Sequence, residues 1–349
     1  MRITYRSLSI AFISLLTAYS LSSSQTFASD KTTPTKLLPS SPTHFNTRDG
    51  STLEARVWNY SKPQHIVLGV HGFNDYSKSF ERLAQHLVSE TQATVYAYDQ
   101  RGFGANPQPG VWPGSEELIN NLRHIAAQLR ERYPGLPLTV IGESMGGAVV
   151  LIAASETPGL AVDQIILKAP AVWGAQSMPL YQRLSLYTMN LIAPETSFTG
   201  RGLSSLDIRP TDDPEVSRDL SRDPLVIKAT RVSSLAGVTE LMGRAQNQTN
   251  LPPQRTLLLY GLRDRIIQPQ PVCDWLTNLN SAASAALKAD VIVYKEGWHM
   301  LTRQLRAREP LEDIAHWLQN IHQTHLQNPV QAQQLVCGGK SMAPGSLIQ

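Results

Sequence analysis

Residues 138–147 read Leu-Thr-Val-Ile-Gly-Glu-Ser-Met-Gly-Gly, a short apolar run that ends in a glycine-rich turn around Ser144. The apolar run predicts a buried strand, and the small and apolar residues from Met145 to Ser155 predict a helix. A Gly-x-Ser-x-Gly sequence between a strand and a helix is typical of a nucleophile elbow, which presents the serine hydroxyl at one edge of a sheet. We therefore predict that Ser144 is a catalytic nucleophile.

Short β-rich runs alternate with longer helical runs on both sides of this stretch, which is the pattern of a parallel sheet covered by helices. Most of the predicted strands are near-continuous in Val, Ile, Leu and Tyr, as expected for strands buried on both faces. They span residues 65–70, 94–98, 138–141, 164–168, 255–260 and 291–294. The predicted helices span residues 77–89, 115–132, 145–155, 271–279 and 309–325. The sequence thus predicts an α/β fold with a mostly parallel central sheet flanked by helices.

The remaining segments predict the domain organisation. Asp49-Gly50, between β-rich residues 43–47 and 53–58, is a strong hairpin signal and predicts an antiparallel edge. The long gap between Lys168 and Arg255 predicts an inserted substructure, with an apolar helical stripe made of Leu180, Leu184, Tyr187 and Leu191. We predict that residues 43–171 and 251–328 form the core and that residues 172–250 form a helical cap insertion. Residues 329–349 are predicted to form a loose tail.

A serine nucleophile needs a base that removes its proton and a third group that orients the base. In this type of fold the acid and then the histidine follow the serine along the chain. Among the nine histidines, His299 alone falls between the last predicted strand and the last predicted helix, where a loop can carry it to the sheet edge. We predict His299 as the base. His316, His322 and His325 are expected on the terminal helix as solvated or packing groups.

The predicted acid is Asp264, which comes soon after the strand 255–260. A carboxylate there can accept the imidazole N–H and stabilise the imidazolium as it forms. An ion pair with Arg263 or Arg265 is the alternative role for Asp264. Asp290 is a second candidate acid, but it precedes its strand and should lie at the opposite edge of the sheet.

The oxyanion of the tetrahedral intermediate needs two hydrogen-bond donors. The backbone N–H of Met145 is the first candidate, and that of Phe73, in the loop after strand 65–70, is the second. His71 is expected to brace this loop. The segment from Asp99 to Gly104 lacks the lysine and the spacing of a phosphate-binding loop, and we expect a structural turn there.

The N-terminal segment predicts export. Two arginines precede an apolar stretch from Leu8 to Leu21, and Thr26-Phe27-Ala28 fits a small-residue cleavage site. We predict a signal peptide at residues 1–28, a linker at 29–42, and a periplasmic or secreted protein. An uncleaved anchor is the alternative, but the apolar stretch is shorter than the roughly 20 residues that span a bilayer.

Charge and composition narrow the classes of ligand. Outside residues 1–28 the chain holds 29 Lys and Arg residues against 28 Asp and Glu residues, so nucleic acid has no electrostatic footprint to bind. The sequence gives no reason to invoke a metal or an organic cofactor. Cys273 and Cys337 are the only cysteines, and a disulfide and two thiols fit this count equally well.

Several motifs, taken in chain order, resemble those of the monoacylglycerol lipase and lysophospholipase branch of the α/β-hydrolases. They are His71-Gly72, Asp99 to Gly104, Gly142 to Gly147, Asp264 and His299. The likeness covers residues 43–325 and includes Arg222-Asp223-Pro224-Leu225 in the predicted cap. It implies the α/β-hydrolase fold, the triad Ser144, Asp264 and His299, and oxyanion donors at Phe73 and Met145. It also implies single-chain acyl esters as substrates and a cap that acts as a lipid-facing lid.

Two positions depart from the pattern of this branch. Tyr76 follows Asp75 where the branch often has a histidine, and Phe103 stands where it usually has a histidine in the Arg-Gly-x-Gly turn. The triad is unaffected, but the substrate headgroup stays undefined.

The sequence therefore predicts a serine hydrolase of carboxylic esters that acts on a small-molecule lipid or ester, with transient contact between the cap and a membrane surface. A serine aminopeptidase is an alternative, in which acidic cap residues would bind the substrate amine: Glu195, Asp212, Asp213 and Glu215. A non-catalytic binding protein with the same fold is the second alternative, and the intact triad argues against it.

Overall fold

The computed structural model describes residues 39–199, 209–282, 289–321, 323 and 325–338. The predicted signal peptide and residues 29–38 of the predicted linker lie outside this part of the chain. Among the helices of the described part, none has the length and apolar character needed to cross a bilayer.

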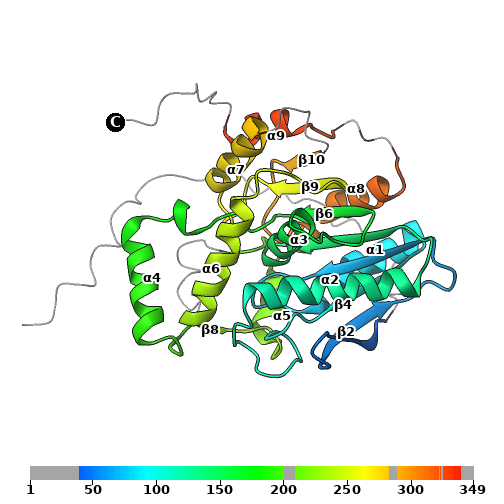
Figure 1. Ribbon diagram of the computed structural model, residues 1–349. Coiled ribbons are helices and arrows are strands. Elements are labelled where there is room, and N and C mark those ends of the chain that lie inside the picture. The colour runs from blue at the N-terminus through cyan, green and yellow to red at the C-terminus, as the bar shows by residue number, and fades with distance from the viewer. Residues whose placement is uncertain (1–38, 200–208, 283–288, 322, 324, 339–349) are drawn as a thin grey trace, which may run out of the picture. The chain divides into compact units, whose positions relative to one another are not determined.

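Eight strands form one sheet in the order β1-β2-β4-β3-β5-β6-β9-β10 (Figure 1). The strands from β4 to β10 in this order run parallel, whereas β2 is antiparallel to both of its neighbours. Their bounds are β1 (Ser41–Asn46), β2 (Thr52–Trp58), β3 (His65–Val70), β4 (Ala93–Tyr98), β5 (Leu138–Glu143), β6 (Gln164–Lys168), β9 (Arg255–Gly261) and β10 (Ala289–Tyr294). The predicted α/β fold and its antiparallel edge are confirmed, and each predicted strand end is correct to within two residues.

Helices cover both faces of the sheet (Figure 1). They are α1 (Glu81–Thr91), α2 (Ser115–Arg132), α3 (Met145–Ser155), α4 (Leu180–Ile192), α5 (Pro214–Arg222), α6 (Val232–Gln246), α7 (Pro269–Ala282), α8 (Arg308–Leu318) and α9 (Pro329–Val336), with short 3-10 turns η1 (Ser77–Phe80), η2 (Ala175–Ser177) and η4 (Leu301–Arg303). Side chains alternate along the strands: Ile66 and Leu68 of β3 join the core under α2 and α3, and Val67 joins the core under α1 and α8. Two apolar cores, one on each face, therefore hold the sheet rigid beneath its carboxyl edge.

Helix α3 directly follows the nucleophile turn and is buried along its length, from Met145 to Ala154. It packs against β5, α2 and α6, which leaves no solvent-facing side. This burial explains why the residues after Ser144 are small and apolar without the periodicity of a surface helix. The turn before α3 is thus anchored between a buried strand and a buried helix.

The predicted cap insertion contains α4, α5 and α6 and a two-stranded antiparallel ribbon of β7 (Ser197–Thr199) and β8 (Ala229–Arg231). Residues 200–208 of the insertion lie outside the described part. Helix α6 packs against α2 and α3, so the last helix of the insertion joins the core. Helix α4 packs against α6 and buries none of its own residues.

The C-terminal predictions were wrong in two places. The helix predicted for residues 309–325 ends at Leu318, since Asn320 adopts a left-handed conformation with a φ of 57° that turns the chain away. His316 lies on α8 as predicted, but His325 lies beyond it, with Nε2 2.8 Å from Oδ1 of Asp313. His322 lies outside the described residues.

The predicted loose tail begins instead with helix α9. Asn328 caps this helix by accepting the N–H of Gln331, the Gln331 side chain accepts the N–H of Asn328, and Pro329 occupies the first turn. A disulfide joins Cys337, just past α9, to Cys273 in α7. Of the two alternatives for the cysteines, the structure therefore contains the disulfide. Residues 339–349 of the predicted tail lie outside the described part.

Candidate active site

Ser144 stands in a strained turn between β5 and α3. Its backbone has a φ of 55° and a ψ of −118°, a combination that non-glycine residues rarely adopt and that costs about 1–3 kcal/mol. Its N–H donates to the carbonyl of Lys168 at 3.0 Å, and its carbonyl accepts the N–H groups of Ala148 and Ala171. Three backbone hydrogen bonds thus hold the turn in this conformation.

The glycines around Ser144 are required by close packing. A Cβ atom on Gly146 would overlap the carbonyl oxygen of Val70, and one on Gly142 would lie 2.5 Å from the carbonyl oxygen of Gly146. A Cβ atom on Gly72 would lie 3.2 Å from the Cβ of Ser144. The loop after β3 therefore lies directly against the serine, as expected for a nucleophile elbow.

A cavity of about 240 Å³ lies beside this turn. Ser144 and His299 both line it, together with the segment from Gly72 to Asp75 on one side and Arg303 on the other. Its lining within the described part of the chain is Gly72, Phe73, Asp75, Glu143, Ser144, Pro210, Ile266, His299, Met300 and Arg303. The structure therefore brings the predicted nucleophile, the predicted base and one predicted oxyanion residue to a single pocket.

His299 is oriented by Asp264, and both side chains are buried. Nδ1 of His299 lies 2.7 Å from Oδ2 of Asp264, while Oδ1 of Asp264 accepts the N–H groups of Ile266 and Ile267. Burial alone would lower the pKa of His299, but the charge and hydrogen bond of Asp264, with the charge of Glu143, raise the pKa above its ordinary value. The carboxylate of Asp264 therefore binds the imidazole of His299 with one oxygen and its own loop with the other.

The other carboxylate considered for this role lies elsewhere. Asp290 stands near the start of β10, where it is paired with Leu257 near the start of β9, whereas Asp264 follows the end of β9. Its carboxylate accepts the indole N–H of Trp317 at 2.6 Å. As predicted, Asp290 lies at the opposite edge of the sheet.

The two predicted oxyanion donors flank the serine. Met145 is the first residue of α3, so its N–H has no acceptor inside the helix. Phe73 is half-buried beside the pocket, and within the described part of the chain its N–H donates to no protein acceptor. Both N–H groups are thus available to a ligand at Ser144.

His71 braces the loop that carries Phe73. Its ring is fully buried, with Nδ1 2.8 Å from the carbonyl of Gly72 and Nε2 accepting the N–H of Gln100 at 2.9 Å. Burial lowers the pKa of His71, which favours the neutral ring. Because Nε2 accepts the N–H of Gln100, the ring proton lies on Nδ1, which faces the carbonyl of Gly72. In the neighbouring turn, Asp99 accepts the N–H groups of Ser77 and Ala105, which is the structural role predicted for that segment.

Sequence reasoning missed a group of buried charged side chains at the pocket: Asp75, Glu143, Lys168 and Arg303, hereafter the buried charge cluster. Nζ of Lys168 lies 3.3 Å from Oε1 of Glu143, and one nitrogen of Arg303 lies 3.3 Å from Oε2 of Glu143 and 2.8 Å from Oδ2 of Asp75. Burial opposes ionisation of Glu143, but Lys168 and Arg303 hold its pKa below the ordinary value. The signal in the sequence was a charged residue at the end of each of two apolar strands, since such charges need buried partners.

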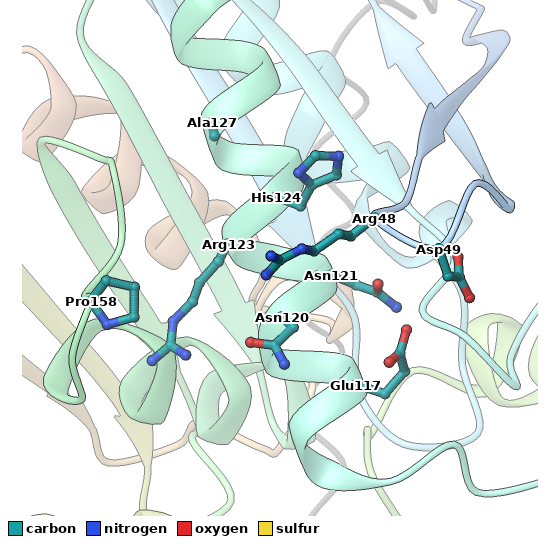
Figure 2. A pocket seen from close by; sticks show the side chains of 9 residues that line it. All are labelled: Arg48, Asp49, Glu117, Asn120, Asn121, Arg123, His124, Ala127 and Pro158. Atoms are coloured by element: carbon teal, nitrogen blue, oxygen red, sulfur yellow. The ribbon is translucent and has the colours of Figure 1, made fainter.

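A second, more open groove of about 620 Å³ lies over the exposed face of α2 (Figure 2). Figure 2 shows the side chains of α2 between Asp49 on one side and Pro158 on the other. Its acids, Asp49 and Glu117, both pair with Arg101, and the described residues that line it include no serine or cysteine. Among the described residues no group of three or more His, Cys, Asp or Glu side chains is placed to hold a metal ion. The pocket at Ser144 is therefore the candidate active site.

Comparison with known proteins agrees with this geometry. The sequence profile of the family described as serine aminopeptidase, S33, matches residues 61–305. Human monoglyceride lipase is 24% identical over 288 residues, which cover 80% of this chain and 89% of that protein. The monoacylglycerol lipase of Mycolicibacterium smegmatis is 25% identical over 272 residues, which cover 75% of this chain and 91% of that protein.

Solved structures show the same fold. A soluble variant of monoglyceride lipase from Saccharomyces cerevisiae, in complex with a substrate analog, superposes with a TM-score of 0.66 at 20% identity, covering 83% of this chain and 99% of the other. A monoacylglycerol lipase from Paleococcus ferrophilus superposes with a TM-score of 0.63 at 22% identity, covering 77% and 99%. With the family profile matching more than half of its length, this chain belongs to the serine aminopeptidase S33 family of α/β-hydrolases.

Proposed function

We propose that this protein is a serine hydrolase that cleaves carboxylic esters with a single acyl chain, such as monoacylglycerols, with Ser144, His299 and Asp264 as its catalytic triad. One observation carries the proposal: Ser144 and His299 share a pocket, and Oδ2 of Asp264 lies 2.7 Å from Nδ1 of His299. The substrate class is supported by relatives that are named monoglyceride and monoacylglycerol lipases.

In the proposed acylation step, the two nitrogens of His299 have different roles. Nδ1 faces Asp264, so Nε2 is the atom that takes the proton of Ser144 while Oγ attacks the acyl carbon. The carbonyl electron pair moves onto oxygen, where the N–H groups of Phe73 and Met145 donate to the oxyanion. When the intermediate collapses, His299 returns the proton to the leaving oxygen, an alcohol departs, and the acyl group stays on Ser144.

Deacylation repeats the steps of acylation with water as the nucleophile. Nε2 of His299 takes a proton from water, the hydroxide oxygen bonds to the acyl carbon, and the same two N–H groups bind the second oxyanion. Collapse breaks the bond to Oγ of Ser144, which recovers a proton from His299. The carboxylic acid leaves and the enzyme returns to its starting state.

The aminopeptidase alternative needs a carboxylate that is available to a substrate amine. Among the described residues that line the pocket, the carboxylates are Asp75 and Glu143, and both are paired with Arg303. The acidic cap residues considered for this role do not line the pocket: Glu195 pairs with Arg231, Asp213 caps α5, Asp212 accepts the N–H of Leu305, and Glu215 lies in the first turn of α5. These contacts favour the ester substrate.

We further propose that helix α4 contacts the lipid surface from which the substrate is taken. The predicted stripe of Leu180, Leu184, Tyr187 and Leu191 exposes between 62% and 74% of each residue's surface to solvent. Apolar side chains gathered in this way on one helix are typical of interaction sites for membranes or proteins. From the N-terminal sequence we also propose that the chain is exported. The disulfide between Cys273 and Cys337 supports an oxidising compartment.

A substrate panel tests the proposed function. Purified protein is assayed with nitrophenyl esters of increasing chain length, a monoacylglycerol, a lysophospholipid and an aminoacyl anilide, with Ser144→Ala as the matched control. We expect ester hydrolysis that disappears in Ser144→Ala, and labelling of Ser144 by a fluorophosphonate. Turnover of the anilide alone would support the aminopeptidase. No turnover together with no labelling would support the binding protein.

A further inference from the structure

The buried charge cluster joins the separate segments that form the pocket. Asp75 belongs to the loop after β3, Glu143 ends β5 directly before the serine, Lys168 ends β6, and Arg303 ends η4 in the loop that carries His299. Each of the four side chains is at most 12% exposed. Because removing a charge from water is costly unless it is paired, these residues constrain one another's positions strongly.

Lys168 connects the turn at Ser144, hereafter the serine turn, to the loop that carries His299 and Arg303, hereafter the histidine loop. It lies directly opposite Glu143 in the register of β5 and β6, and its backbone carbonyl accepts the N–H of Ser144 at 3.0 Å. Its ammonium group lies 3.3 Å from Glu143 and donates to Oγ1 of Thr302 at 2.7 Å. Thr302 is three residues beyond His299, so one lysine contacts the backbone of Ser144 and the loop that carries His299.

Arg303 also binds Asp75, which lies with Phe73 in the loop after β3, hereafter the oxyanion loop. Its guanidinium lies between Asp75 and Glu143 and lines the pocket. The cluster has two acidic and two basic members, so it is neutral as a whole. A lone carboxylate at Glu143 would oppose the negative charge that forms on the substrate oxygen, and the two cations offset that effect.

We propose that Glu143 is a positioning residue of the hydrolase, which together with Lys168 and Arg303 holds the serine turn, the oxyanion loop and the histidine loop in the arrangement that the reaction requires. The proposal rests on the proposed function. Stability alone does not explain such a cluster, because buried ion pairs are often replaceable by apolar residues without loss of stability.

The charge of Glu143 also acts on His299. The charged groups that act on this ring include Asp264, Glu143 and Arg303; the two carboxylates raise the pKa of His299 and Arg303 lowers it, against the lowering by burial. Removing the charge of Glu143 therefore lowers the pKa of His299. An effect of this kind is visible in a pH profile, where a role in packing alone would leave the profile unchanged.

The test compares three variants with the wild-type chain: Glu143→Gln, the double variant Glu143→Gln/Lys168→Met, and Asp313→Asn as the control. Asp313 is a buried carboxylate on α8 that binds Tyr294 and His325 and does not line the pocket. The main measurement is the rate of fluorophosphonate labelling against pH, in which Oγ of Ser144 bonds to phosphorus, fluoride leaves and the serine proton passes to His299. Ester turnover and thermal unfolding are measured in parallel.

For Glu143→Gln we expect labelling at least about tenfold slower, and an acid limb of the profile that lies at lower pH than in the wild-type chain. The double variant should recover most of the thermal stability that Glu143→Gln loses, because no unpaired ammonium remains, but should not recover the labelling rate. Asp313→Asn should unfold at a lower temperature and keep the wild-type profile.

The proposal is overturned if the double variant labels at the wild-type rate, if the acid limb of Glu143→Gln stays in place, or if Asp313→Asn shifts the limb equally. Failure of the proposed function is a separate outcome. If the wild-type chain is labelled at Ser144 but hydrolyses no ester, the ester function is wrong, while the labelling profiles still decide the role of Glu143.

Discussion

Asp264 binds His299 with one carboxylate oxygen and its own loop with the other: Oδ2 lies 2.7 Å from Nδ1 of His299, and Oδ1 accepts the N–H groups of Ile266 and Ile267 at 2.7 and 2.9 Å. The two backbone bonds prevent the carboxylate from rotating. The imidazole therefore carries a proton on Nδ1, which leaves Nε2 to act as a base.

Replacing Asp264 by Asn should lower kcat by about 10³–10⁴-fold without unfolding the protein. The Asn oxygen can still accept from Ile266 and Ile267, so its NH₂ group would face Nδ1 of His299 and favour the tautomer with the proton on Nε2. That tautomer cannot take the proton of Ser144. Ester turnover and circular dichroism of the variant test this expectation.

Asp290→Asn is the matched control, because Asp290 lies at the opposite edge of the sheet and binds Trp317. It should keep near wild-type turnover. If Asp264→Asn keeps its activity and Asp290→Asn loses it, the acid of the triad has been assigned wrongly.

The pH dependence of kcat/KM should reflect the raised pKa of His299. Although burial lowers this pKa, Asp264 and Glu143 raise it above the ordinary value of 6.5. Only the neutral ring can act as the base, so activity should rise with pH through a midpoint above 6.5. A profile measured with a soluble nitrophenyl ester decides this, and a midpoint below 6.5 contradicts the electrostatic argument.

The parts of the molecule that sequence reasoning predicted well depend on contiguous residues. The strands around Ser144 are continuous apolar runs, and the turn between β5 and α3 needs its glycines for reasons of local space. The positions of Asp264 and His299 follow from the order of strands, because the carboxyl ends of parallel strands meet at one edge of a sheet.

The buried charge cluster was not predictable in the same way, because it depends on register. Glu143 and Lys168 are opposite each other only once β5 and β6 are aligned, and Arg303 reaches them from a third segment. Helix α9 was missed for a different reason. Its Gln-rich sequence has little apolar periodicity, yet the capping pair of Asn328 and Gln331 was present in the sequence and marks the start of a helix.

Removing the disulfide should destabilise the protein by about 2–4 kcal/mol, because the link between Cys273 and Cys337 closes a long loop, with a sequence separation of 64. The double variant Cys273→Ser/Cys337→Ser should unfold at lower urea concentration and keep its ester turnover, since neither residue lines the pocket. Reductant should destabilise the wild-type chain and leave the double variant unchanged. Equal midpoints for the two oxidised proteins would refute this contribution.

His65 should make the protein less stable at acid pH. Burial lowers the pKa of His65 to about 4, and its Nε2 lies 2.7 Å from Oγ1 of Thr139. Between pH 6.5 and 4 the unfolded chain takes up a proton that the folded ring does not, so the free energy of unfolding falls as pH falls. At about 1.4 kcal/mol per unit, the loss over this window is about 3 kcal/mol.

Urea unfolding across this pH range tests the contribution of His65. The variant His65→Gln should show a flatter dependence of the unfolding free energy on pH. His44→Gln, which changes an exposed histidine on β1, should keep the wild-type dependence. If both variants follow the wild-type curve, another group causes the acid sensitivity.

Helix α4 should control access to aggregated lipid without affecting the chemistry. Leu184 and Tyr187 are 62% and 70% exposed, so changing both to Gln should not disturb the fold. Burying a leucine in an apolar phase is worth about 1.5–3 kcal/mol, so partial loss of these contacts should weaken binding to phospholipid vesicles by about tenfold. The KM for dispersed monoacylglycerol should rise, while kcat/KM for a soluble short-chain ester should stay the same.

Thr188→Gln, on an exposed polar position of the same helix, is the control and should leave vesicle binding unchanged. If Leu184→Gln/Tyr187→Gln binds vesicles like the wild-type chain, the exposed face of α4 serves some other partner, because its apolar surface would then contribute nothing to lipid contact.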